Sequence, residues 1–210
     1  MAAAAVVALC VLIVLGVRFF KISPRPAGVD ARVAARSAGD PAAPLRIVEH
    51  IDFQCQSCSY AALLLRDTMK SHPSLIRLEV KFHPLKAHPH GLRSALYAEC
   101  AARQEKFWGF YYKLFEKQAE WSTLETIEGT FHEYARALGL DQRALDSCLG
   151  DPETEKAVLD EKAAADALGV DVTPTFFMNG KMVVGPKGLV QELQAHLGGY
   201  STRFVEKVDK

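Results

Sequence analysis

The apolar pattern of the chain predicts a buried strand that leads directly into a helix. Residues 45–53 carry branched and aromatic side chains at Ile47, Val48, Ile51 and Phe53, which is typical of a largely buried strand. Residues 59–70 instead place Leu63, Leu64 and Met69 at helical spacing. We therefore expect the intervening residues to lie at the N-terminus of a helix.

A second structured region is predicted towards the end of the chain. The apolar run 176–178 turns through Asn179-Gly180 into 181–184, and Asn-Gly between apolar runs is a strong β-hairpin signal. Pro174 comes just before the first of these strands, where a proline costs no ladder hydrogen bond. Its sequence context alone does not distinguish a functional cis bond from a simple strand start. A last helix is predicted over 187–197.

The residues between these two regions predict a compact helical subdomain. Helices are expected over 124–138, 141–149 and 152–168, with Asp141 and Asp151 as N-caps. We expect aromatic residues such as Trp108 to lie in its core. Two further helices are indicated by apolar stripes, which comprise Leu92, Leu96, Ala98, Ala101 and Ala102, and then Phe107, Phe110, Tyr111, Leu114 and Phe115.

Cys55-Gln56-Ser57-Cys58 occupies the junction between the first strand and its helix. Unpaired amides and the helix dipole favour an anionic sulfur at a helix N-terminus, so Cys55 is predicted to be the attacking thiolate and Cys58 its resolving partner. Two other interpretations are a structural disulfide and a zinc site. Zinc needs further ligands, for which His88 and His90 are candidates, but no second CxxC occurs. We predict redox chemistry, with neither a metal nor a cofactor.

These motifs together resemble the DsbA-type thiol-disulfide oxidoreductases of the thioredoxin-like superfamily. The resemblance covers about residues 44–198 and implies an α/β thioredoxin fold with a helical insertion, about 91–168, between the CxxC helix and the cis-Pro strand. The matching positions are Val48-Glu49, Asp52-Phe53-Gln54-Cys55, His83-Pro84-Leu85, His88-Pro89, Lys106-Phe107-Trp108, Leu114-Phe115, Leu138-Gly139-Leu140-Asp141, Thr173-Pro174-Thr175-Phe176-Phe177 and Asn179-Gly180.

The resemblance also implies roles for individual residues. Pro174 would be a cis-proline beside the disulfide, and Thr173 would present backbone groups to a bound peptide. Glu49 would be a buried acid that manages the proton of the resolving cysteine, although a strand position facing solvent is the alternative. Gln56-Ser57, which we expect to contact the substrate, stands where the best-known oxidants have Pro-His.

The composition indicates one catalytic domain and gives no indication of nucleic-acid binding, because 25 basic side chains balance 25 acidic ones. We expect the Cys55-Cys58 disulfide to be exchanged with cysteines of exported client proteins, with the protein as the oxidant. A membrane oxidase or a thioredoxin-like partner would recycle it. The alternatives are a disulfide reductase or isomerase, a protein like the kappa-class glutathione transferases, and a non-catalytic metal- or peptide-binding module.

The N-terminal residues indicate in which cellular compartment the protein works. Residues 1–22, with an unbroken apolar run over 2–17, predict a membrane anchor or a signal segment. Basic residues follow this run and none precedes it, so the positive-inside rule alone would keep the domain in the cytosol. Because the chemistry suits an oxidising compartment, we expect a membrane-anchored protein of the cell envelope with its domain in the periplasm or extracytoplasmic space, or a secreted one after cleavage. Residues 23–43 are predicted to be an exposed linker and 199–210 a C-terminal tail.

Three cysteines lie outside the CxxC motif. Cys10 falls in the apolar run, whereas Cys100 and Cys148 fall on predicted helices of the insertion. In an oxidising compartment Cys100 and Cys148 would form a structural disulfide, and the alternative is two separate buried thiols.

Overall fold

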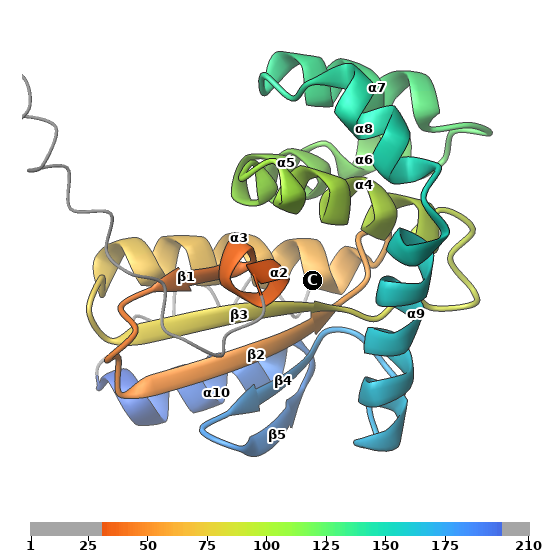
Figure 1. Ribbon diagram of the computed structural model, residues 1–210. Coiled ribbons are helices and arrows are strands. Elements are labelled where there is room, and N and C mark those ends of the chain that lie inside the picture. The colour runs from red at the N-terminus through yellow and green to blue at the C-terminus, as the bar shows by residue number, and fades with distance from the viewer. Residues whose placement is uncertain (1–30, 199–210) are drawn as a thin grey trace, which may run out of the picture. The chain divides into compact units, whose positions relative to one another are not determined.

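The computed structural model describes residues 31–198, which are built around a five-stranded sheet in the order β1-β3-β2-β4-β5 (Figure 1). Strands β2 and β3 run parallel, and the other neighbouring strands are antiparallel. The strands are β1 (Ser37–Gly39), β2 (Leu45–Ile51), β3 (Ile76–Phe82), β4 (Thr175–Met178) and β5 (Lys181–Val184). The thioredoxin-like α/β arrangement predicted from the sequence is confirmed.

Helices α3 (Gln56–Ser71) and α10 (Gly185–Leu197) pack together on one face of this sheet, behind the strands in Figure 1. Helix α3 connects the parallel strands β2 and β3 and buries side chains at helical spacing, among them Cys58, Ala61 and Leu65. Strand β3 is not among the expected elements. Its burial alternates residue by residue, and it lies between β1 and β2 in the sheet.

The insertion between β3 and β4 is helical, as predicted. It consists of α4 (Gly91–Arg103), α5 (Phe107–Glu116), α6 (Gln118–Trp121), α7 (Glu128–Ala137), α8 (Gln142–Leu149) and α9 (Pro152–Ala167). Both expected N-caps are present, since Asp141 accepts a hydrogen bond from Ala144 N and Asp151 accepts one from Glu153 N. Helix α9 packs against α4 and β3 and so connects the insertion to the sheet.

Two expectations need correction. Trp108 is only partly buried, because it lies at the edge of the aromatic core beside Phe107 and Tyr111. The predicted linker 23–43 is structured in its second half, where α2 (Ala31–Ala35) is followed by β1. Strand β1 lengthens the sheet by pairing with β3, and these backbone hydrogen bonds could not be anticipated from the composition of the segment.

A buried arginine strengthens this second half of the predicted linker. Arg36 is 4% exposed and binds both carboxylate oxygens of Glu161 in α9 at 2.7 Å. Its guanidinium also lies 4.4 Å from the centre of the Phe82 ring and 3.7 Å from Glu99. One side chain therefore connects the segment before β1 with the sheet and with two helices of the insertion.

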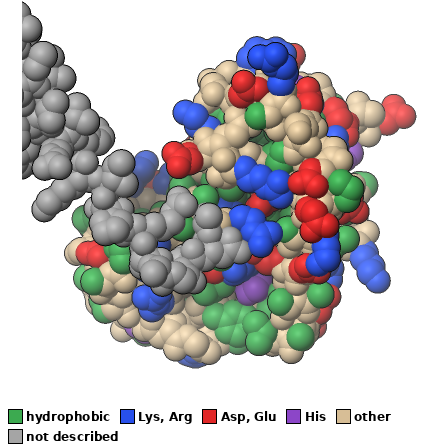
Figure 2. Space-filling model, viewed as in Figure 1, with side chains coloured by type: hydrophobic (Ala, Val, Ile, Leu, Met, Phe, Trp, Pro, Cys, Tyr) green, Lys and Arg blue, Asp and Glu red, His purple; other side chains and the backbone are tan. Residues whose placement is uncertain are grey.

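The face seen in Figure 2 carries basic and acidic side chains interleaved, in keeping with the balanced composition. Among residues 31–198, no helix has the length and apolar character needed to span a membrane. The predicted anchor with Cys10, the first part of the linker and the C-terminal tail lie outside the described residues.

Candidate active site

The CxxC motif lies where β2 passes into α3, as the sequence predicts. Cys55 is the N-cap residue of α3, with extended backbone angles, and its side chain is partly exposed. Cys58 lies in the first turn of the helix and is 0% exposed. Both sulfurs are free thiols in this structure. A client can therefore reach Cys55 but has no direct access to Cys58.

The two thiols differ sharply in acidity. The pKa of Cys55 is lowered to about 6, chiefly because the Cys58 thiol hydrogen-bonds to its sulfur. Thr173 and the nearby backbone amides of Cys58 and Ser57 also lower this pKa, whereas partial burial opposes them. Burial is the main reason why the pKa of Cys58 is raised well above its ordinary value. At neutral pH, Cys55 is a thiolate and Cys58 a thiol.

The Thr173-Pro174 segment lies beside Cys55, although it follows more than a hundred residues later in the chain. The peptide bond between these two residues is cis. In the thiol form, the sulfur of Cys55 donates a hydrogen bond to the carbonyl oxygen of Thr173 at 3.3 Å. The carbonyl of Pro174 in turn accepts a hydrogen bond from Gly185 N, which joins this segment to the start of α10. Two segments distant in sequence thus meet at one sulfur.

Glu49 is completely buried, so its predicted burial is confirmed and the alternative of a solvent-facing position is wrong. Its Oε2 atom accepts a hydrogen bond from the Tyr111 hydroxyl at 2.9 Å, and Oε1 is buried with no partner among the described residues. Burial raises the pKa of this carboxyl to about 8, and the Tyr111 hydrogen bond opposes the rise. A negative charge on Glu49 would also raise the pKa of Cys58, so the two groups are coupled.

The residues between the cysteines, Gln56 and Ser57, are both exposed at the start of α3. They directly follow Cys55 in the chain, so a polypeptide that reaches the Cys55 sulfur passes close to them. Their predicted contact with substrate stays a prediction.

The histidines considered as zinc ligands have other partners. His88 Nδ1 lies 3.0 Å from Oδ2 of Asp52, and His90 Nε2 lies 2.8 Å from the carbonyl oxygen of Leu124. Asp52 is itself buried and accepts hydrogen bonds from the amides of Gln54 and Leu85. Within residues 31–198, no three His, Cys, Asp or Glu side chains are grouped as metal ligands.

The helical insertion also holds the CxxC loop, chiefly through Gln118, a side chain that the sequence did not single out. Gln118 in α6 donates hydrogen bonds to the carbonyl oxygens of Phe53, at 2.7 Å, and Cys55, at 2.9 Å. Gln54 donates to the carbonyl oxygen of Ser122 at 2.8 Å. Amides at such positions have no sequence signature, because their significance depends on which backbone carbonyls fold against them.

Cys100 and Cys148 form a disulfide between α4 and α8, which is the pairing expected from the sequence rather than two separate thiols. Their Cα atoms are 5.8 Å apart, and Cys100 is fully buried. The disulfide joins two helices of the insertion and is separate from the thiols of the CxxC motif.

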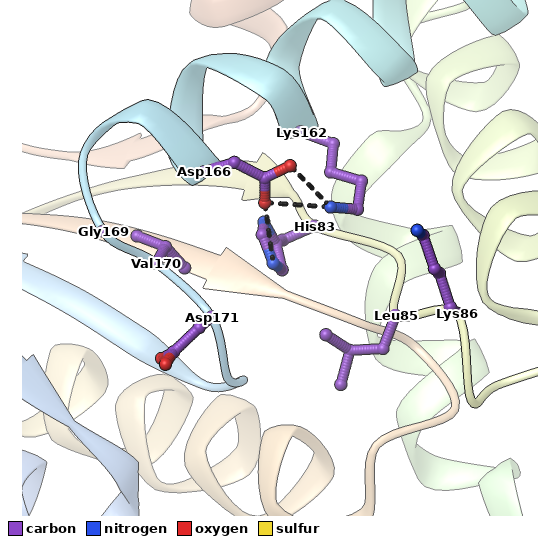
Figure 3. A pocket seen from close by; sticks show the side chains of 8 residues that line it. All are labelled: His83, Leu85, Lys86, Lys162, Asp166, Gly169, Val170 and Asp171. Atoms are coloured by element: carbon purple, nitrogen blue, oxygen red, sulfur yellow. Dashed lines mark hydrogen bonds and ion pairs between the residues drawn. The ribbon is translucent and has the colours of Figure 1, made fainter.

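A hollow of about 430 Å³ adjoins the residues that precede Thr173 (Figure 3). Lys162 points towards Asp166, 2.8 Å away, and His83 lies 3.7 Å from the same carboxylate. Burial is the main reason why the pKa of His83 is lowered, so the ring is neutral at neutral pH. Lys86 and Asp171 complete the charged wall, in which two lysines balance two aspartates. The hollow therefore has no strong preference for an anionic or a cationic ligand.

Comparison with known proteins agrees with this geometry. A family model described as thioredoxin matches residues 32–196. The chain belongs to the thioredoxin family. This thioredoxin-family chain is 35% identical over 169 residues to the Na(+)/H(+) antiporter NhaA 1 of Mycolicibacterium gilvum, a match that covers 76% of the chain and 26% of the antiporter. The chain thus spans about a quarter of the length of this curated relative.

Solved structures similar to this thioredoxin-family protein include DsbA-type proteins. Wolbachia pipientis alpha-DsbA1 superposes with a TM-score of 0.65 at 21% identity, over 82% of this chain and 94% of that one. A protein-disulfide isomerase from Novosphingobium aromaticivorans gives a TM-score of 0.60 at 22% identity, over 78% and 97%. At these identities the similarity establishes the fold. The predicted resemblance to the DsbA type is therefore confirmed for the fold.

Proposed function

We propose that this thioredoxin-family protein is a thiol-disulfide oxidoreductase that exchanges a Cys55-Cys58 disulfide with cysteines of client proteins. The observation that carries the proposal is the pairing of a partly exposed thiol of low pKa, Cys55, with a buried thiol of high pKa, Cys58, beside a cis-proline. Only the thiolate is nucleophilic, so this asymmetry assigns attack to Cys55 and resolution to Cys58.

In the proposed oxidising reaction, a client thiolate attacks the sulfur of Cys55 in the oxidised pair. The Cys55-Cys58 bond breaks, a mixed disulfide forms, and the Cys58 thiolate leaves and takes a proton. Glu49, which holds a proton at neutral pH, is coupled to Cys58 and is the proposed donor. A second client thiolate then attacks the client sulfur of the mixed disulfide and releases Cys55 as a thiolate, so the client is oxidised by two electrons and the enzyme is reduced.

The acidity of Cys55 supports the oxidising direction. A pKa of about 6 stabilises the reduced, thiolate form of the site and makes Cys55 a good leaving group. Both effects favour transfer of the disulfide to a client. In reverse, the same residues would reduce or isomerise client disulfides, and the reduction potential decides between the directions.

Client contacts are proposed for Thr173, Gln56 and Ser57, because all three lie next to the accessible sulfur in space or in sequence.

We propose an exported, membrane-anchored protein whose domain works in the cell envelope outside the cytoplasm. A membrane oxidase or another thioredoxin-like protein would re-oxidise it. The Cys100-Cys148 disulfide supports an oxidising compartment, since such bonds are rare in the cytosol.

The deciding experiment is a redox titration of the full chain in glutathione buffers. Thiols are trapped with acid, and the peptide carrying Cys55 and Cys58 is quantified by mass spectrometry separately from Cys100 and Cys148. A potential above about −150 mV would support a disulfide donor, and one below about −230 mV a reductase. If the pair never forms a disulfide, the proposed function is wrong.

A trapping experiment tests whether Cys55 is the attacking thiol and Cys58 the resolving one. The probe is an unfolded client whose cysteine is joined to a small thiol in a mixed disulfide. In Cys58→Ser, the Cys55 thiolate should attack the client sulfur and expel the small thiol, so that a Cys55-client disulfide accumulates. Cys55→Ser should form none at the motif, because the remaining thiol there, Cys58, is buried. Equal trapping by both variants would contradict the assignment of Cys55 as the attacking group.

A further inference from the structure

The loop that carries the nucleophile has no local cap to hold it. Cys55 is the N-cap residue of α3, a position where Ser, Thr, Asp or Asn normally accepts a hydrogen bond from a helix amide. The Cys55 thiol makes no such capping bond and turns to the carbonyl oxygen of Thr173 instead. Within the loop, Asp52 accepts hydrogen bonds from the amides of Gln54 and Cys55, which leaves the carbonyl side of the loop to be held from elsewhere.

Gln118 in the insertion holds the carbonyl side of the loop. Its side-chain amide donates to the carbonyl oxygens of Phe53 and Cys55, at 2.7 and 2.9 Å, and the residue is 8% exposed. The Cys55 carbonyl also accepts hydrogen bonds from the amides of Cys58 and Ser59. Gln118 therefore binds the carbonyl oxygen at which α3 begins, and it fixes the peptide groups that follow Phe53 and Cys55.

The helix that carries Gln118, α6, is packed firmly against α5. Trp121, in the same short helix, is 0% exposed and donates a hydrogen bond to the carbonyl oxygen of Leu114 at 2.8 Å. Ser59, one residue after Cys58, donates to the carbonyl oxygen of Phe115 at 3.1 Å. Helices α5 and α6 thus contact the CxxC loop and the first turn of α3.

We propose that Gln118 is a positioning residue for disulfide exchange, whose side-chain amide holds the Cys55 carbonyl so that the Cys55 sulfur stays at the N-terminus of α3. This inference rests on the proposed function and assigns a task to the insertion. The Gln118 donors compensate the partial negative charge on two carbonyl oxygens of the loop. Without them these carbonyls turn towards other donors, and the sulfur leaves its place near the amides of Ser57 and Cys58.

The test compares Gln118→Met with Gln104→Met in the full chain, purified in a mild detergent. Gln104 is a matched control, because it too makes two side-chain hydrogen bonds to backbone groups, at Asp141 N and Asp141 O, but within the insertion. Iodoacetamide alkylation of Cys55 is followed across pH by mass spectrometry, and chemical unfolding of each variant is measured alongside.

For Gln118→Met we expect the pH midpoint of Cys55 alkylation to rise by about 0.7 unit and the rate at pH 6 to fall about three-fold, since a neutral hydrogen bond contributes about 1 kcal/mol and one pKa unit corresponds to about 1.4 kcal/mol. Gln104→Met should react as the wild type does while losing similar stability. Gln118→Glu, which puts a carboxylate against the two carbonyls, should react more slowly still at neutral pH.

A Gln118→Met variant that is less stable but keeps the wild-type pH midpoint and rate would overturn the proposal and leave Gln118 a purely structural residue. The proposal would also fail if Gln104→Met slowed the alkylation of Cys55 equally. The alkylation assay needs no client and no oxidant. If the wild type fails in the glutathione titration, the proposed function falls, while these rates still decide whether Gln118 positions the thiolate.

Discussion

Replacing Glu49 by Gln should change how the stability of the protein depends on pH. The carboxyl has an ordinary pKa of 4.5, which burial raises to about 8 in the folded protein. Between these values, the folded protein keeps a proton that the unfolded chain has lost. The unfolded state therefore binds fewer protons, and the free energy of unfolding falls as pH rises through this window. Below pH 4.5 and above about 8 the contribution is constant.

The size of the effect follows from the two pKa values. At about 1.4 kcal/mol per unit, the difference between 4.5 and about 8 corresponds to roughly 5 kcal/mol, lost in full by pH 9. Gln has nearly the same shape, stays neutral and still accepts the hydrogen bond from Tyr111. We expect Glu49→Gln to gain several kcal/mol over the wild type between pH 5 and pH 9, so the variant is the more stable protein in alkali.

The assay is urea unfolding at pH steps from 4.5 to 9, monitored by circular dichroism. Both proteins carry Cys55→Ala, so that no disulfide can form at the site. The assay then needs no added reductant, which would also reduce the Cys100-Cys148 bond. Glu133→Gln, a change of an exposed glutamate in α7, serves as the control and should leave the pH dependence unchanged. A stability difference between wild type and Glu49→Gln that is constant from pH 5 to 9 would refute the argument.

Three further outcomes are expected. The alkylation rate of wild-type Cys55 should rise with pH to a plateau with a midpoint near 6, and a midpoint above 8 would contradict a stabilised thiolate. Cys148→Ser should lower the free energy of unfolding by about 4 kcal/mol, since the disulfide to Cys100 closes a loop of 48 residues, and denaturant titration measures the loss. Arg36→Ala should cost about 3–5 kcal/mol, because it leaves the largely buried carboxylate of Glu161 without its bidentate partner. A loss below about 1 kcal/mol in the same titration would mean that the segment before β1 contributes little to the fold.

Much of the fold is readable from short stretches of the chain. The hairpin at Asn179-Gly180 needs two residues with positive φ, and φ is 49° and 86° there. Asp141 and Asp151 cap their helices because each side chain reaches the backbone within two or three residues. Strand β3 was not anticipated, although its alternation of apolar and polar residues is a local strand signal. The α2–β1 segment was not anticipated because β1 is formed by pairing with β3, which is distant in sequence.

The candidate site divides in the same way. The sequence by itself determined that Cys55 and Cys58 lie at the start of a helix, because strand, motif and helix follow one another without a gap. Only the tertiary structure decided that Glu49 is fully buried beside Tyr111 and that Gln118 holds the loop. Burial and carbonyl contacts depend on residues more than 60 positions away, and the apolar pattern around one side chain does not record which distant segment will cover it.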